Sequence, residues 1–151
     1  MRALLQRVRS ASVTVDGSVI ASIQSGLLIL VGFTHDDTPE TLEPVANKIL
    51  NLRIFNDSEG VMNRSLRDVR GEILLVSQFT LYAQCAKGNR PSYVQSASRQ
   101  VAEPLYEHLI RLFGCLYDIP IRCGRFGADM QVSLCNDGPV TIFIDSKMRD
   151  F

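Results

Sequence analysis

Hydrophobic and polar residues alternate near both ends of the chain, and two continuous apolar runs lie between them. Residues 2–15 alternate as in a half-buried strand, and Asp16-Gly17 predicts a hairpin turn into a second strand at Val19-Ile20. Residues 27–33 and 73–76 are apolar throughout, which is typical of strands covered on both faces. The pattern therefore predicts a sheet with two central strands.

Two segments instead place apolar residues at helical spacing. The first follows a turn at residues 34–39, and the second follows Ser98, which can cap a helix. Their expected buried faces are Leu42, Val45, Ala46, Ile49 and Leu50, and then Val101, Ala102, Leu105, Leu109, Leu112 and Phe113. Pro44 indicates a regular start near Thr41 or a kink, and Pro104 indicates a bend. With final strands over residues 121–144, we expect a single mixed α/β domain, 1–151, with helices on one side.

Residues 130–135 and 140–144 alternate as two strand-like halves, and Asn136-Asp137-Gly138-Pro139 joins them. By itself this junction favours a hairpin turn. A cis peptide costs little before proline, so the corner can hold its carbonyls in an unusual direction. The sequence leaves the choice between cis and trans open.

The overall composition limits the possible partners. Lys and Arg number 16 and Asp and Glu also number 16, so any contact with RNA must be local. The four cysteines form no C-x-x-C pair and no histidine lies at ligand spacing, so we expect no metal, no cofactor and no disulfide framework. With no signal peptide and no apolar run that could span a bilayer, the expected location is the cytoplasm.

The usual hydrolytic groups are poorly represented. His35 lies in a charged turn and His108 on a predicted helix, so neither is expected to act as a base. Asp129 and Asp137 are not spaced as an acid/base pair, and buried reduced cysteines usually behave as small hydrophobes. Attention falls on Ser77-Gln78-Phe79-Thr80-Leu81 at the end of a buried strand, where a purely structural role is equally open.

Six segments, taken together, resemble the D-aminoacyl-tRNA deacylases. The two signature motifs are Ser77-Gln78-Phe79-Thr80-Leu81 and Asn136-Asp137-Gly138-Pro139-Val140-Thr141. The others are Arg53-Ile54-Phe55, Gly60-Val61-Met62-Asn63, Gly88-Asn89-Arg90-Pro91-Ser92 and Gly124-Arg125-Phe126-Gly127-Ala128-Asp129-Met130. They occur in the family's order along nearly the whole chain.

The resemblance implies a three-layer β/β/α fold, with mixed, largely antiparallel sheets and two main helices, that works as a symmetric homodimer. The implied substrate is a tRNA acceptor end carrying a D-amino acid or glycine. The implied hydrolytic wall is Ser77, Gln78, Phe79 and Thr80, with Thr80 the best side-chain candidate. The implied chiral filter is Gly138 and Pro139, entering the pocket of the other subunit, with Met130 in the pocket lining.

Ester hydrolysis of this kind needs no strong side-chain base. An aminoacyl ester is already activated and has a ribose 2′-hydroxyl beside it, so orientation and one oxyanion donor can suffice. A backbone N–H at Phe79 or Thr80 can supply that donor, worth about 3 to 4 kcal/mol. If the Gly138-Pro139 bond is cis, its carbonyls can receive the α-amino group and exclude an L side chain, which predicts residual action on glycyl-tRNA.

The basic loop that carries Lys87, Asn89 and Arg90 is the predicted tRNA contact, through phosphate and shape. Three other functions stay open. The chain could be a non-catalytic tRNA- or nucleic-acid-binding module, or a sister deacylase that removes a small L-amino acid from mischarged tRNA. A small-molecule esterase is disfavoured because the sequence has no nucleophile elbow.

Overall fold

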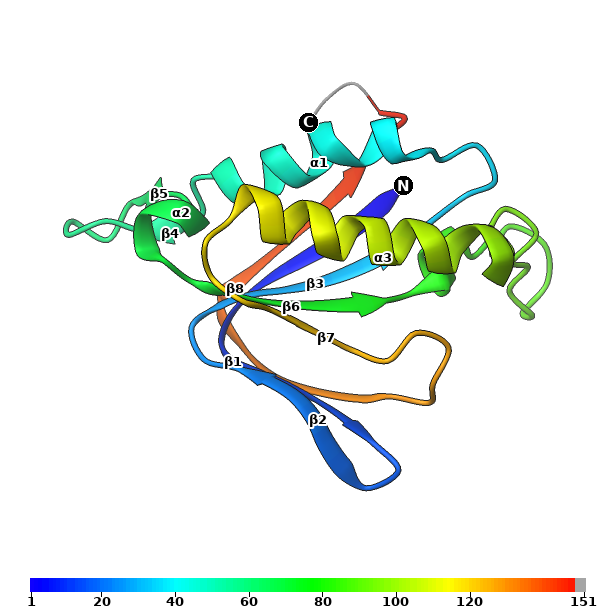
Figure 1. Cartoon of the computed structure of the whole chain (residues 1–151), viewed down its shortest axis with the longest axis horizontal. Coiled ribbons are helices and arrows are strands. Elements are labelled where there is room, and N and C mark those ends of the chain that lie inside the picture. Colours follow the sequence, from blue (N-terminus) through cyan, green and yellow to red (C-terminus); the bar gives the residue numbers. More distant parts are fainter. Residues whose placement is uncertain (149–151) are drawn as a thin grey trace.

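The structure, a computed structural model, describes residues 1–148, and its sheet is organised around β1 (Arg2–Val15). The first half of β1 pairs antiparallel with β3 (Gly26–Gly32), and its second half pairs antiparallel with β2 (Ser18–Ile23). Along its other edge, β1 pairs antiparallel with β8 (Gln131–Asp145). A single strand therefore links both halves of a curled sheet (Figure 1).

The parallel part of the sheet lies beyond β3. β3 pairs parallel with β6 (Glu72–Ser77), and β6 pairs parallel with β7 (Ile121–Cys123). β3 is buried at every position except the half-buried Leu30, as its apolar run predicted. The sheet is therefore mixed, with its antiparallel pairs gathered around β1.

Two long helices, α1 (Pro39–Asn51) and α3 (Arg99–Leu116), cover one face of the sheet (Figure 1). For the first helix, Pro44 indicated either a regular start near Thr41 or a kink. The start near Thr41 is wrong, because α1 begins at Pro39, with Thr38 as its N-cap. In α3, Tyr106 is buried although the predicted stripe omitted it, and Val101 is 37% exposed. Among the described residues, no helix is long and apolar enough to cross a membrane.

The core has two parts, which correspond to the predicted β/β/α layers. One part lies between the helices and the sheet and includes Leu27, Ile29 and Phe113. The other lies inside the curl, where Leu28, Leu74 and Val76 meet the following residues of β1 and β2: Val8, Ala11, Val13, Val15, Ala21 and Ile23. Since β2 contacts both β6 and β7, the sheet nearly closes into a barrel. The three-layer prediction is confirmed.

Three short elements connect α1 to β6. β4 (Phe55–Asn56) and β5 (Met62–Arg64) form a small hairpin, and α2 (Leu66–Val69) follows it. Ser65 caps α2, because its hydroxyl accepts a hydrogen bond from the Asp68 N–H. As predicted, residues 56–60 form a tight connection, which Gly60 closes with a positive φ of 81°.

The chain does not form the hairpin turn that the junction near Gly138 favours when it is taken by itself. Both halves of β8 pair with the same strand, β1, so β8 passes through the junction without reversing. Between the pairs Val8–Asn136 and Gln6–Thr141, residues 137–140 of β8 lie opposite Arg7 alone. The Gly138-Pro139 peptide bond in this bulge is cis.

Candidate active site

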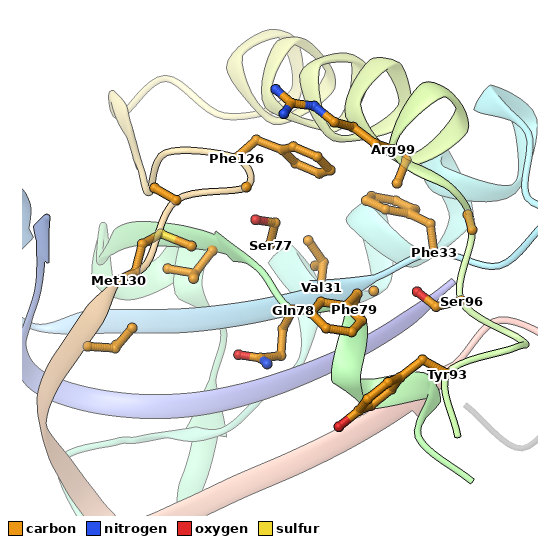
Figure 2. A pocket seen from close by; sticks show the side chains of 17 residues that line it. Val31, Phe33, Ser77, Gln78, Phe79, Tyr93, Ser96, Arg99, Phe126 and Met130 are labelled. Atoms are coloured by element: carbon orange, nitrogen blue, oxygen red, sulfur yellow. The ribbon is translucent and has the colours of Figure 1, made fainter. Parts of the chain in front are cut away.

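A cavity of about 630 Å³ opens between the end of β6, the start of α3 and the segment that leads into β8 (Figure 2). Its lining is mainly apolar and aromatic, with a few polar groups, which is typical of a ligand site. The lining residues used below are Ser77, Gln78, Phe79, Tyr93, Arg99, Gly127 and Met130.

The end of β6 supplies the first side of the cavity. The Gln78 N–H donates to the Val31 carbonyl at 2.6 Å, and the 3₁₀ turn η1 (Phe79–Tyr82) then redirects the chain. Ser77, Gln78 and Phe79 line the cavity, whereas Thr80 is not among its lining residues. The Thr80 hydroxyl accepts a hydrogen bond from Gln78 Nε2, which connects it to the wall.

Phe79 is the most exposed part of this side, and an aromatic neighbour supports it. Its side chain is 56% exposed, and the Tyr93 ring contacts it edge-on with the centroids 5.0 Å apart. The segment carrying Tyr93 is tied to the end of β3, because the Ala97 N–H donates to the Phe33 carbonyl at 2.9 Å. Sequence reasoning missed Tyr93, although it directly follows the Gly88–Ser92 motif.

The opposite side of the cavity is built from α3 and the segment before β8. Met130 lies in this side (Figure 2), and a Cβ placed on Gly124 would come within 2.7 Å of its sulfur. Gly124 therefore leaves room for Met130. Arg99 lies over Gly127 and pairs with Glu103, with 2.9 Å between Nε and Oε2. This pairing raises the pKa of Arg99, because Glu103 both accepts hydrogen bonds from the guanidinium and attracts its charge.

The nucleophiles that sequence reasoning weighed lie elsewhere. No cysteine or histidine is among the residues that line the cavity. Burial raises the pKa of the Cys123 thiol to about 11, so it stays protonated at neutral pH. Within residues 1–148, no three His, Cys, Asp or Glu side chains are grouped to hold a metal ion.

The Gly138-Pro139 bulge does not line the cavity of its own chain. Both residues are exposed, and the Arg7 side chain bonds the neighbouring Asp137 of the bulge. Arg7 Nε donates to the Asp137 carbonyl and lies 3.2 Å from the Asp137 carboxylate. A Cβ on Gly138 would lie 2.9 Å from Val140 Cγ2 and 3.0 Å from Arg7 Nη2, and φ is +123°. This position therefore requires glycine.

Sequence reasoning also missed Arg7 and Asn136 as supports of the bulge. The Asn136 amide donates to the carbonyls of Arg7 and Val140, at 2.9 and 3.1 Å. Arg7 also donates to the Ile54 carbonyl at 2.6 Å and is 6% exposed. One signal was available, because the alternation in β1 places Arg7 on the same buried face as Ala3 and Leu5.

The predicted tRNA contacts lie on an exposed loop outside the cavity. Gln84 and Ser92 close this loop through two backbone hydrogen bonds of 2.8 and 2.9 Å. Lys87, Asn89 and Arg90 are exposed within it, and Gly88 has a positive φ of 65°. The structure thus presents these three side chains to solvent.

The geometry can be compared with known proteins. A family model described as D-Tyr-tRNA(Tyr) deacylase matches residues 4–145. The chain belongs to this family. A D-aminoacyl-tRNA deacylase of Thermosipho melanesiensis is 53% identical over 147 residues, which cover 97% of this chain and 98% of the relative. One of Christiangramia forsetii is 54% identical over 149 residues, which cover 99% of each. The predicted enzyme class, a D-aminoacyl-tRNA deacylase and thus a hydrolase, is confirmed.

Solved structures support the fold of this deacylase family member. A structure titled c-Myc DNA Unwinding Element Binding Protein is 44% identical, with a TM-score of 0.90, and covers 96% of this chain and 98% of that one. A probable eukaryotic D-amino acid tRNA deacylase is 19% identical, with a TM-score of 0.82, and covers 95% and 97%. The second likeness bears on the fold alone.

Proposed function

We propose that this chain hydrolyses the ester bond between a D-amino acid, or glycine, and the 3′ end of tRNA. The observation that carries the proposal is the cavity of about 630 Å³, with Ser77, Gln78 and Phe79 on one side, in a chain of this deacylase family. The polar groups of that side come from the end of a buried strand and a 3₁₀ turn, which hold them at defined positions.

The start of the 3₁₀ turn supplies the oxyanion donors. The first N–H groups of a helical turn lack acceptors within the turn. Across residues 1–148, neither the Phe79 nor the Thr80 N–H donates to a backbone carbonyl outside it. Both can therefore stabilise the carbonyl oxygen when water attacks the ester, and one such donor is worth about 3 to 4 kcal/mol. The carbon–oxygen bond to ribose then breaks, and the ribose oxygen takes up a proton.

In this proposal, handedness is sorted by main-chain groups of a second subunit. Gly138 and Pro139 are exposed in their own chain and held by Arg7, so a partner's cavity can receive them. Their carbonyls accept hydrogen bonds from the α-ammonium group of the substrate. In this position they leave no room for the side chain of an L-amino acid. Glycine has no side chain to exclude, so the enzyme also acts on glycyl-tRNA.

The homodimer that this requires is supported by the surface of β8. Within residues 1–148 this strand pairs with β1 alone, and Leu134 and Phe143 are 39% and 48% exposed on either side of the bulge. An edge strand with exposed apolar side chains favours association with a second copy. Such an interface places the bulge at the boundary between subunits.

The remaining parts of the proposal concern tRNA and location. Lys87, Asn89 and Arg90 contact phosphates of the acceptor end, so affinity falls as salt rises. All four cysteines are free, which is consistent with the reducing cytoplasm.

The test of the reaction uses the purified chain with D-tyrosyl-, L-tyrosyl- and glycyl-tRNA and follows release of free amino acid. We expect release from the D-tyrosyl and glycyl esters and negligible release from the L-tyrosyl ester. Binding of all three with release of none would instead identify a binding module. A separate reaction with L-alanyl-tRNA tests the sister activity, which release from this substrate alone would identify.

The test of the shared site mixes Phe79→Ala and Gly138→Ala, after each variant has been shown to be inactive by itself. A mixed dimer has one site that combines an intact wall with an intact filter. Random exchange at equal concentrations should therefore restore about one quarter of the wild-type sites. If the mixture stays as inactive as its components after verified subunit exchange, the filter does not act across subunits.

A further inference from the structure

One arginine outside the cavity connects the 3₁₀ turn η1, which begins with Phe79 and Thr80, to the end of β8. Arg2 lies at the start of β1, where it pairs in register with Gly32 of β3 and Asp145 of β8. Its Nε donates to Asp145 Oδ2 at 2.8 Å, and its Nη1 donates to the Leu81 carbonyl at 2.9 Å. A single guanidinium therefore spans two segments that are far apart in the sequence.

The aromatic surroundings of Arg2 fix its orientation further. The guanidinium carbon lies 4.5 Å from the centre of the Tyr82 ring and 5.9 Å from the centre of the Phe143 ring. Stacking of this kind suits the planar guanidinium better than a lysine ammonium. The Arg2 side chain is 25% exposed and that of Asp145 is 5% exposed, so solvent screens this pair little.

The segment that Arg2 holds is the same short turn that begins with Phe79 and Thr80. η1 contains four residues, so its Leu81 carbonyl and the Thr80 N–H move together. On its other side the turn packs tightly on β3, because a Cβ on Gly32 would lie 2.7 Å from the Gln78 carbonyl and 3.3 Å from Leu81 Cβ. The turn is thus fixed between a glycine of β3 and the guanidinium of Arg2.

We propose that Arg2 is a positioning residue for deacylation. It holds the Phe79–Tyr82 turn so that the Phe79 and Thr80 N–H groups keep their place at the cavity, and it does not itself line the cavity. The inference rests on the proposed function only for its kinetic readout, because the hold on the turn can be measured without substrate.

The kinetic test compares Arg2→Met, Arg2→Lys and wild type on D-tyrosyl-tRNA. Methionine keeps an apolar stem but loses both hydrogen bonds, and small displacements of catalytic groups cost large factors in rate. We expect kcat to fall about tenfold or more, with KM within about twofold, because the substrate-binding surface remains. Arg2→Lys keeps the charge and a single donor nitrogen, so we expect partial recovery.

The structural test measures amide hydrogen exchange of the peptide that contains the 79–82 turn. We expect faster exchange there in Arg2→Met, with the exchange of α3 unchanged. Arg111→Met is the matched control, because Arg111 is 66% exposed on α3 and its nearest carboxylate, Glu107, is 4.0 Å away. That variant should alter neither the exchange of the turn nor kcat.

Two results would overturn the inference. Unchanged exchange in the 79–82 turn of Arg2→Met would show that Arg2 does not hold it, whatever the activity. A fall in kcat that only matches a fall in the folded fraction would show a role in stability alone. If wild type releases no D-tyrosine, the proposed function fails, and the exchange measurement still decides the role of Arg2.

Discussion

The Tyr93 ring meets the Phe79 ring edge-on, with 5.0 Å between centroids and 68° between planes. Phe79 is more than half exposed, so this contact is a main restraint on its position at the cavity. An aromatic pair of this kind contributes about 0.5–1.5 kcal/mol beyond the area it buries.

Replacing Tyr93 by alanine should therefore weaken catalysis. We expect kcat/KM for D-tyrosyl-tRNA to fall about threefold to tenfold in Tyr93→Ala, in line with the energy of such a pair. Tyr93→Phe keeps the ring and should stay within about twofold of wild type. If both variants lose the same factor, the hydroxyl and not the ring contact is what matters.

Arg7 is expected to contribute strongly to stability. Its buried guanidinium binds the Ile54 carbonyl and the Asp137 carboxylate, so Arg7→Met leaves the buried Ile54 carbonyl without this donor and leaves the 32% exposed Asp137 carboxylate with its exposed partner Arg9. We expect the free energy of unfolding to fall by about 3 kcal/mol or more. Urea unfolding followed by circular dichroism is the suitable measurement, since the chain has no tryptophan.

Arg9→Met is the matched control for that experiment. Arg9 also pairs with Asp137, at 3.1 Å, but its side chain is 77% exposed. Exposed ion pairs contribute little, so the expected loss is below about 1 kcal/mol. Equal losses in the two variants would contradict the importance assigned to the buried position of Arg7.

The pair between Arg2 and Asp145 predicts a dependence of stability on pH. Burial of Asp145 opposes its ionisation, but hydrogen bonds from Arg2 and the Lys147 N–H outweigh this and hold its pKa below the ordinary value of 3.8. Because the pKa is lower in the folded state, the ionised carboxylate stabilises the fold fully above pH 3.8. That contribution is lost as the pH falls through the lowered folded-state pKa.

Asp145→Asn isolates this effect. At pH 7 we expect the variant to be less stable than wild type by about 2 kcal/mol, the usual range for a hydrogen bond to a charged group. The difference should shrink as the pH falls below 3.8. A difference that stays constant down to pH 2.5 would mean that the charge of Asp145 does not contribute.

Two buried tyrosines should respond in opposite ways to loss of their hydroxyl groups. The Tyr82 hydroxyl has no hydrogen-bond partner among the described residues, whereas the Tyr106 hydroxyl donates to the Leu75 carbonyl at 2.8 Å. Burial raises the pKa of both phenols, so both remain neutral. Tyr82→Phe should leave the unfolding free energy unchanged or raise it, and Tyr106→Phe should lower it by about 1 kcal/mol or more. A loss in Tyr82→Phe as large as that in Tyr106→Phe would contradict this assignment.

Local signals in the sequence predicted much of the fold. Burial on both faces makes β3 and β6 continuous apolar runs, and the turn at Asp16-Gly17 needs the positive φ values of 51° and 77° that these residues tolerate. The path of β8 was not predictable in this way. Its continuity depends on pairing with β1 and on the Asn136 amide, which bonds the Arg7 carbonyl across the sheet.

The residues of the candidate site also fall into those that local sequence predicted and those that it did not. Ser77, Gln78 and Phe79 are adjacent in sequence, so a polar end to an apolar strand was enough to find them. Arg2, Arg7 and Tyr93 act through contacts with distant segments, and no local pattern marks an arginine that reaches a carbonyl 79 residues away. Arg2 and Tyr93 are recognised as supports only when the tertiary contacts are known, whereas the alternation in β1 already indicated that Arg7 is buried.

The pairing of β1 with β8 also has a consequence for biosynthesis. Arg2 and Asp145 bond across 143 residues of sequence, so β1 leaves the ribosome long before its second neighbour exists. Until then one whole edge of the nascent sheet is open to wrong partners, and long-range pairing of this kind forms slowly. The sheet therefore cannot be completed until β8, the last strand to be synthesised, is available to pair with β1.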